Sequence, residues 1–182
     1  MRRLFVKIDD FIPSAEQVLW RAGCPAHRAG ESLENAAALA LETLKDQAGN
    51  ARWGALLFQP EQAPPFIAGM HPHRSVTVMA ATLGIEVDRL ISGAPGLSVF
   101  MLDSAASVAV ELLVKRLQAG IGRLLGMVPT ARSAPGYGGF PISYQREIID
   151  MFPMLGITCG DGYLLSPLKS MTGVTGWIPP EG

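Results

Sequence analysis

The chain is 182 residues long, enough to build one domain around a hydrophobic core without disulfides or a structural metal. Apolar residues make up 48% of it and charged residues 17%, which excludes an intrinsically disordered protein. Its formal net charge is −1 and its basic residues form no block. Nucleic acid is therefore not an expected partner, because phosphate binding requires clustered lysines and arginines.

The sequence also predicts that no segment crosses a membrane. Its longest apolar runs are interrupted by charged residues such as Asp103 and Glu111, short of the roughly 20 apolar residues that a bilayer requires. No apolar segment typical of a signal peptide follows the basic residues at the start of the chain. The two cysteines, Cys24 and Cys159, have no CxxC spacing. We therefore expect a cytoplasmic protein with two reduced thiols.

The first part of the chain predicts mainly helices. Residues 7–12 indicate a short strand or an extended segment. Ser14 and Gln17 have the spacing of a capping box, which predicts the start of a helix that Gly23 can end. A second helix, rich in alanine and leucine, is predicted over residues 32–48.

The middle of the chain predicts two strands, over residues 53–58 and 75–82, followed by the longest helix, over residues 97–125. Apolar residues recur in this helix at steps of three and four, as expected of a helix with a buried face. Polar and charged residues follow one another at steps of four on another face: Asp103, Ser107, Glu111 and Lys115.

Short apolar segments alternate with glycine and proline after Pro129, and they predict a helix over 143–152 and strands near 163–166 and 170–178. The absence of a regular βαβ alternation predicts an α+β fold, with several helices packed on a twisted antiparallel sheet. We expect one domain over 1–182. Its helical N-terminal part spans 1–50 and its core spans 51–182.

The segment from Arg132 to Pro141 is the first candidate binding site. Three glycines and two prolines in ten residues predict an exposed, shaped loop, and glycines allow a ligand to approach the main chain closely. Main-chain groups can then bind the edge of a nucleobase, while an adjacent arginine can bind a carboxylate with two hydrogen bonds. S-adenosylmethionine presents both groups. The alternative is an ordinary turn with a solvated arginine.

A second segment, Ser166 to Gly176, indicates by itself only a turn and a strand with a solvated Lys169. Together, the two segments resemble the S-adenosylmethionine-binding activation domain of cobalamin-dependent methionine synthase. The similarity covers about 45 residues. Its elements, in order, are Arg132-x-x-Pro135-Gly136-Tyr137, a helix with Gln145 near its start, Leu155-Gly156-Ile157-Thr158, and Pro167-x-x-Ser170-x-Thr172-Gly173.

The resemblance implies a domain that binds S-adenosylmethionine and presents its methyl group to a cobalamin. In the family, an oxidised cob(II)alamin is reduced by one electron and trapped by methylation, so the protein contributes positioning and the cofactor supplies the chemistry. Carried over residue by residue, the carboxylate of the ligand would contact Arg132. Its adenosine would contact Ala134, Gly136 and Tyr137.

Two acidic positions of the family match this chain less closely. A glutamate of its long helix corresponds to Glu111, whose alternative role is an exposed ion pair with Lys115. An aspartate near the N-terminus of the family corresponds to Asp9 or Asp10. We assign no catalytic residue.

The chain departs from the complete synthase in ways that imply partners. It has Val174-Thr175 where the synthase has an aromatic pair, and it contains no Asp-x-His-x-x-Gly cobalamin signature. Its cysteines are too few for a three-thiolate zinc site. The corrinoid should therefore arrive on a cobalamin-binding methyltransferase subunit, with an electron from a flavodoxin-like or other donor. The alternative is a non-catalytic accessory module that binds S-adenosylmethionine or the corrinoid protein.

We predict that Phe140, Leu168 and Lys169 face this partner from loops beside the ligand. Two other patterns carry no function. His71 and His73 lack a third metal ligand. The glycine loop at 157–162 lies too near the end of the chain to begin a dinucleotide-binding fold.

Overall fold

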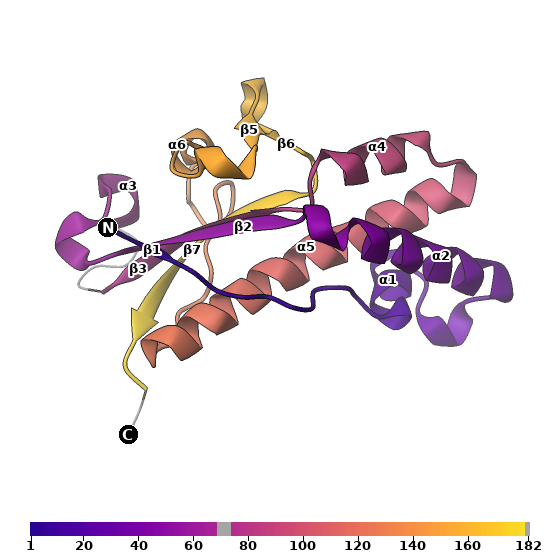
Figure 1. Ribbon diagram of the computed structural model, residues 1–182, viewed down its shortest axis with the longest axis horizontal. Helices are drawn as coiled ribbons and strands as arrows, with labels where there is room; N and C mark the ends of the chain where they lie inside the picture. The colour runs from indigo at the N-terminus through magenta and orange to yellow at the C-terminus, as the bar shows by residue number, and fades with distance from the viewer. Residues whose placement is uncertain (69–73, 181–182) are drawn as a thin grey trace.

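The structure is a computed structural model that describes residues 1–68 and 74–180, and it contains one five-stranded antiparallel sheet (Figure 1). The strands lie in the order β1-β2-β3-β7-β4. Their bounds are Arg2–Leu4 for β1, Arg52–Phe58 for β2, Val76–Thr82 for β3, Val128–Pro129 for β4 and Ser170–Ile178 for β7. A separate hairpin joins β5 (Thr158–Cys159) to β6 (Leu165–Ser166). The predicted α+β class is confirmed.

Helices cover both faces of the sheet. The α-helices of the described residues are α1 (Ala15–Arg21), α2 (Glu31–Gln47), α3 (Pro65–Ala68), α4 (Ile85–Gly93), α5 (Gly96–Leu125) and α6 (Tyr144–Asp150). Short 3₁₀ helices lie at Ala26–Arg28, Ala48–Asn50, Pro60–Gln62, Pro153–Leu155 and Asp161–Tyr163. In Figure 1, α5 runs diagonally along one face of the sheet while α6 and the β5–β6 hairpin lie beyond the other.

The two central strands are buried because side chains alternate across the sheet. In β2, Ala55 and Leu57 face α5, whereas Leu56 and Phe58 face α6. All seven residues of β3 are buried, since helices cover both of its faces and strands flank both of its edges. The mainly apolar composition of β3, with only Thr77 and Thr82 as polar residues, therefore follows from its central position.

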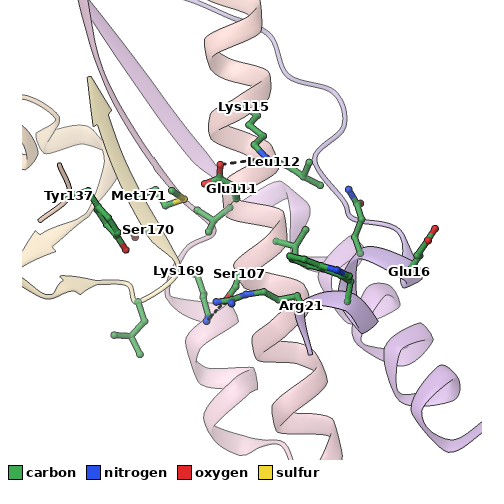
Figure 2. A pocket seen from close by; sticks show the side chains of 15 residues that line it. Glu16, Arg21, Ser107, Glu111, Leu112, Lys115, Tyr137, Lys169, Ser170 and Met171 are labelled. Carbon is green, nitrogen blue, oxygen red and sulfur yellow. Dashed lines mark hydrogen bonds and ion pairs between the residues drawn. The ribbon is translucent and has the colours of Figure 1, made fainter. Parts of the chain in front are cut away.

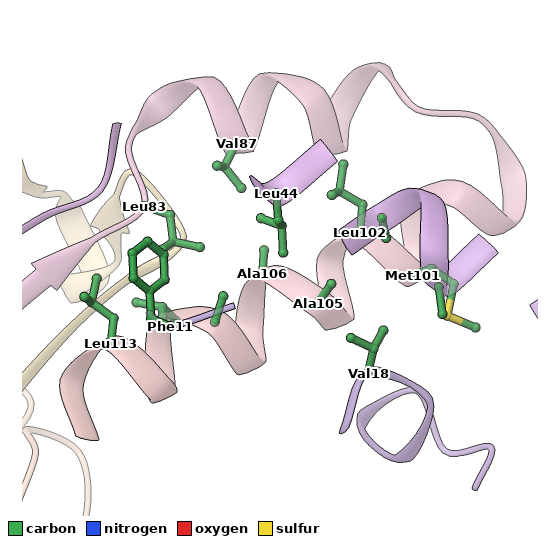
Figure 3. Packing of buried hydrophobic residues seen from close by; sticks show 14 of the residues in the cluster. Phe11, Val18, Leu44, Leu83, Val87, Met101, Leu102, Ala105, Ala106 and Leu113 are labelled. Atoms are coloured by element: carbon green, nitrogen blue, oxygen red, sulfur yellow. The ribbon is translucent and has the colours of Figure 1, made fainter. Parts of the chain in front are cut away.

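Helix α5 is the core helix of the fold. Its N-terminal half packs against α1, α2 and α4 through small residues such as Ala105 and Ala106, which allow close approach (Figure 3). Its C-terminal half packs on the sheet through Leu117 and Ile121. Contrary to our expectation, α5 is long and apolar enough to cross a membrane, and it is the one such helix within the described ranges. Its buried face accounts for that composition.

Several predicted elements are confirmed. Helix α1 has both hydrogen bonds of the capping box, from the Gln17 amide to the Ser14 hydroxyl and from the Ser14 amide to the Gln17 side chain. Residues 7–12, predicted as a short strand or an extended segment, form no strand. The first strand of the chain is β1, which precedes them. Helix α4 was not predicted.

Candidate functional site

A cavity of about 870 Å³ lies where α1, α5, the glycine-rich loop and the start of β7 meet (Figure 2). This volume is within the range of small-molecule binding sites, about 300–1,000 Å³. Helix α1 lines it with Glu16, Gln17, Trp20 and Arg21. Helix α5 contributes Ser107, Val108, Val110, Glu111, Leu112 and Lys115, and the remaining wall consists of Tyr137, Leu168, Lys169, Ser170 and Met171. The cavity therefore brings together segments that are far apart in the sequence.

The polar face of α5 that the sequence indicated is the face that lines this cavity. Residues four apart lie one above another on a helix, about 6 Å along its axis. Three of the four polar residues therefore line the cavity: Ser107, Glu111 and Lys115. Asp103 follows at the next turn and contacts Lys169.

Arg132 and Glu111 form an ion pair beside the cavity. The guanidinium Nη2 donates to the Glu111 Oε1 at 2.6 Å, and the Lys115 Nζ lies 3.7 Å from the same oxygen. The Arg132 side chain is only 16% exposed. Glu111 thus forms the ion pair with Lys115 that the sequence offered as one alternative, and it also pairs with Arg132. Its contact with a ligand stays a prediction. Arg132 itself is not among the residues that line the cavity, and it adjoins the cavity through its contact with Glu111.

Gly173 of β7 leaves the space that the Arg132 side chain occupies. A Cβ atom at Gly173 would lie 2.7 Å from the Arg132 Cδ and 3.0 Å from its Cγ. Any other residue here would therefore displace the arginine stem from the sheet. This close approach explains a glycine in the middle of a buried strand, where it costs backbone entropy.

The glycine-rich loop begins at the edge of the sheet. Ser133 forms a two-bond bridge with Val174, with N···O distances of 2.9 and 2.8 Å. The loop then turns on itself, with the Gly136 amide donating to the Phe140 carbonyl and the Tyr137 amide donating to the Ala134 carbonyl. These two amides are therefore engaged within the loop.

The conformation of the loop requires its glycines. Gly136, Gly138 and Gly139 have φ angles of 91°, 58° and 80°, in the left-handed region that favours glycine. The resulting turn exposes 75% of Tyr137 and places this residue at the wall of the cavity. Ala134 and Gly136 lie next to that wall but do not line the cavity.

The predicted partner-facing residues behave differently from one another. Phe140 is 4% exposed and packs with Phe66 and Tyr144, at ring-centroid distances of 6.4 and 5.7 Å. The prediction that it faces a partner is wrong, because its ring is part of the core beneath α6. Leu168 is 68% exposed at the mouth of the cavity, and its contact with a partner stays a prediction.

Lys169 is not a solvated lysine. Its side chain is 13% exposed, and its Nζ lies 2.7 Å from the Asp103 Oδ1 and 2.9 Å from the Ser107 Oγ. Lys169 is therefore held in the cavity wall by two acceptors of α5. The interpretation of Lys169 as a solvated residue is therefore wrong, and its contact with a partner stays a prediction.

The sequence missed the wall formed by α1. Val18 and Leu19 of this short helix are buried, and Trp20 is 72% exposed at the cavity. A large aromatic residue outside the apolar positions of a helix is the signal that could have identified this wall. Neither Asp9 nor Asp10 lines the cavity.

The described part of the chain contains no group of three or more histidine, cysteine, aspartate or glutamate side chains that could bind a metal. His71 and His73 lie outside the described residues. Both cysteines are free thiols. The glycine-containing segment at 157–162 forms part of the β5–β6 hairpin and opens no helix of a dinucleotide-binding fold.

No protein-family model matches this chain, and no curated protein matches it in sequence. Among solved structures, it is similar to the MetH reactivation domain bound to AdoHcy (S-adenosylhomocysteine). That likeness has a TM-score of 0.60 at 14% sequence identity, and it covers 94% of this chain and 75% of the other. At this identity the likeness shows the fold alone: the chain has the fold of a methionine synthase reactivation domain.

Proposed function

We propose that this protein binds S-adenosylmethionine at the cavity between α1, α5 and β7. In this proposal it presents the methyl group of that ligand to a corrinoid held by a separate methyltransferase subunit. The observation that carries the proposal is the ion pair of Arg132 and Glu111 beside a cavity of suitable volume. The similar fold of a domain that binds AdoHcy supports it.

The Arg132–Glu111 pair has the charges needed to bind an amino-acid zwitterion. A guanidinium has five N–H donors, and only one is used by Glu111, so the others can bind the carboxylate of the ligand. The Glu111 carboxylate can accept hydrogen bonds from the α-ammonium group. Because the two residues hold each other in place before the ligand arrives, little side-chain entropy is lost on binding.

The adenosine part would lie against the glycine-rich loop, in contact with Ala134, Gly136 and Tyr137. The exposed ring of Tyr137 offers a flat apolar surface at the cavity. The amides of Gly136 and Tyr137 are engaged in the loop, so the main-chain contacts would come from the Ala134 N–H and the Gly136 carbonyl. Within the described residues, neither group has a main-chain partner.

The remaining chemistry belongs to the partners. The corrinoid, held by its own subunit, would supply the chemistry: it would take up the sulfonium methyl group together with one electron from a flavodoxin-like or other donor, and S-adenosylhomocysteine would be released. The residues of this chain bind and orient the ligand, and the mechanism assigns no acid or base to them. A split methionine synthase is the setting that this division of roles favours. Reactivation of another corrinoid methyltransferase requires the same steps.

Titration of the protein with S-adenosylmethionine will show one ligand bound per chain. Calorimetry measures the heat of binding and hence the number of ligands bound. Tryptophan fluorescence gives a second signal, because Trp20 lines the cavity whereas Trp53 is half-buried and Trp177 is buried. The Trp20→Phe variant should lose the fluorescence change and keep the heat. The absence of heat with the wild-type protein would refute ligand binding.

Substitution of Leu168 by aspartate will spare S-adenosylmethionine binding and abolish methylation of the cognate corrinoid protein. Leu168 is exposed at the mouth of the cavity, where a charge would disturb an apolar contact with a partner. The assay follows the corrinoid spectrum with reductant and ligand present. Leu164, exposed between the 3₁₀ helix Asp161–Tyr163 and β6 and outside the cavity lining, offers Leu164→Asp as a matched control. Ligand binding without any methylation by the wild type would favour the accessory-module function.

A further inference from the structure

Lys169 is fixed more firmly than a lysine in a loop usually is. Its Nζ contacts the Ser107 hydroxyl (Figure 2). It also contacts the Asp103 carboxylate, one helical turn away on α5. The carbonyl of Lys169 accepts from the Leu83 amide at 2.9 Å. The preceding amide, of Leu168, donates to the Asp88 Oδ2 at 2.6 Å. Side chain and main chain are thus held by separate contacts.

The ammonium group of Lys169 still has one hydrogen to donate. It carries three N–H donors, and the contacts with Asp103 and Ser107 use two of them. The described residues supply no third acceptor, and Lys169 lines the cavity. Its side chain is only 13% exposed, so an acceptor atom in the cavity would form a hydrogen bond that is largely shielded from water. Because Asp103 balances the lysine charge, the pair does not repel a cationic sulfonium.

Lys169 and Arg132 occupy different levels of the same helix face. Arg132 contacts α5 at Glu111, while Lys169 contacts it at Ser107 and Asp103, one and two turns towards the N-terminus. At 1.5 Å per residue, these levels are separated by about 6–12 Å. A single ligand can therefore contact both Arg132 and Lys169 only if two different parts of the ligand do so. If its carboxylate is at Arg132, its nucleoside part is the one that reaches Lys169.

We propose that Lys169 is a ligand-binding residue. Its third N–H donates to acceptor atoms of the nucleoside, the ribose oxygens or the adenine ring nitrogens. This inference rests on the proposed function and adds a polar contact for the nucleoside that the glycine-rich loop does not provide. Asp88, Asp103 and Ser107 are then positioning residues, because they act through Lys169.

Substitution of Lys169 by methionine, which keeps an unbranched apolar side chain and removes the donor, tests the inference. We expect the affinity for S-adenosylmethionine, measured by calorimetry, to fall about tenfold or more, the effect of losing a hydrogen bond to a charged group. The affinity for adenosine should fall by a similar factor, and the affinity for L-methionine should not change. Ligand-observed NMR reaches the millimolar affinities of these fragments.

The Lys7→Met variant is the matched control, because Lys7 also pairs with an aspartate but lies outside the cavity lining. If Lys169→Met does not fold, the double variant Asp103→Asn/Lys169→Met removes the donor without leaving an unpaired carboxylate on α5. Unchanged S-adenosylmethionine affinity, weakened L-methionine binding, or no adenosine binding by the wild type would each overturn the assignment. Failure of the wild type to bind S-adenosylmethionine would instead refute the proposed function.

Discussion

Replacement of Arg132 by alanine will weaken S-adenosylmethionine binding by about 1.5–3 kcal/mol, the usual contribution of hydrogen bonds to a charged group. Replacement by lysine should recover only part of this loss, because an ammonium keeps the charge but cannot form the planar, two-pronged contact with a carboxylate. Calorimetric titration of both variants measures the affinities. The affinity for S-adenosylmethionine should increase in the order alanine, lysine, arginine at position 132.

The structure also predicts a moderate loss of fold stability in the Arg132→Ala variant, which the sequence did not. The arginine stem packs over Gly173 and its guanidinium pairs with Glu111, so both contacts disappear. Arg116, exposed on α5 and outside the cavity lining, provides the control variant Arg116→Ala. A lower melting temperature with unchanged ligand affinity would show that Arg132 serves the fold alone.

Replacement of Trp177 by alanine will reduce the free energy of unfolding by about 3–5 kcal/mol, the usual cost of deleting a large buried aromatic side chain. Trp177 is fully buried near the end of β7, where its ring packs against Gly122 of α5. Its indole Nε1 donates to the Thr77 Oγ1 at 2.7 Å. Urea unfolding followed by circular dichroism measures the loss.

Two further variants separate packing from hydrogen bonding at this position. Trp177→Phe keeps most of the ring but leaves the buried Thr77 hydroxyl without its donor, so its effect should be smaller than that of alanine. Adding Thr77→Val should restore part of the stability, since an unpaired buried hydroxyl is then removed. An alanine variant as stable as the wild type would mean that the α5–β7 interface tolerates a cavity there.

The elements that could be predicted from the sequence are those defined by local patterns. The capping box of Ser14 and Gln17 placed the start of α1 correctly, and the apolar periodicity placed α5. Strand β1 has only three residues and is stabilised by pairing with β2, a contact about fifty residues away along the chain. Helix α4 lacks a side-chain cap and follows Gly84, which has a φ of 90°. Neither element has a local signal.

The residues of the candidate site also fall into those that a local sequence pattern indicates and those that depend on distant contacts. Arg132 and Tyr137 were predicted because their motif is continuous in the sequence, and the structure places Tyr137 at the cavity wall and Arg132 in contact with Glu111. The contact of Lys169 with Asp103 joins positions 66 residues apart, and it depends on how β7 lies against α5. The sequence showed Asp103 and Ser107 on one helix face but not which segment would cover that face. Phe140 was misplaced because its loop reaches back into the core beneath α6.

The wall formed by α1 has a consequence for the energetics of ligand binding. An isolated helix of seven residues is not stable in water, so α1 persists because Val18 and Leu19 pack into the core. A ligand that fills the cavity touches α1, α5 and β7 together, and it loses one set of contacts whenever α1 unfolds locally. Occupancy of the cavity and order of the N-terminal segment are therefore thermodynamically linked. Each stabilises the other by the same free energy.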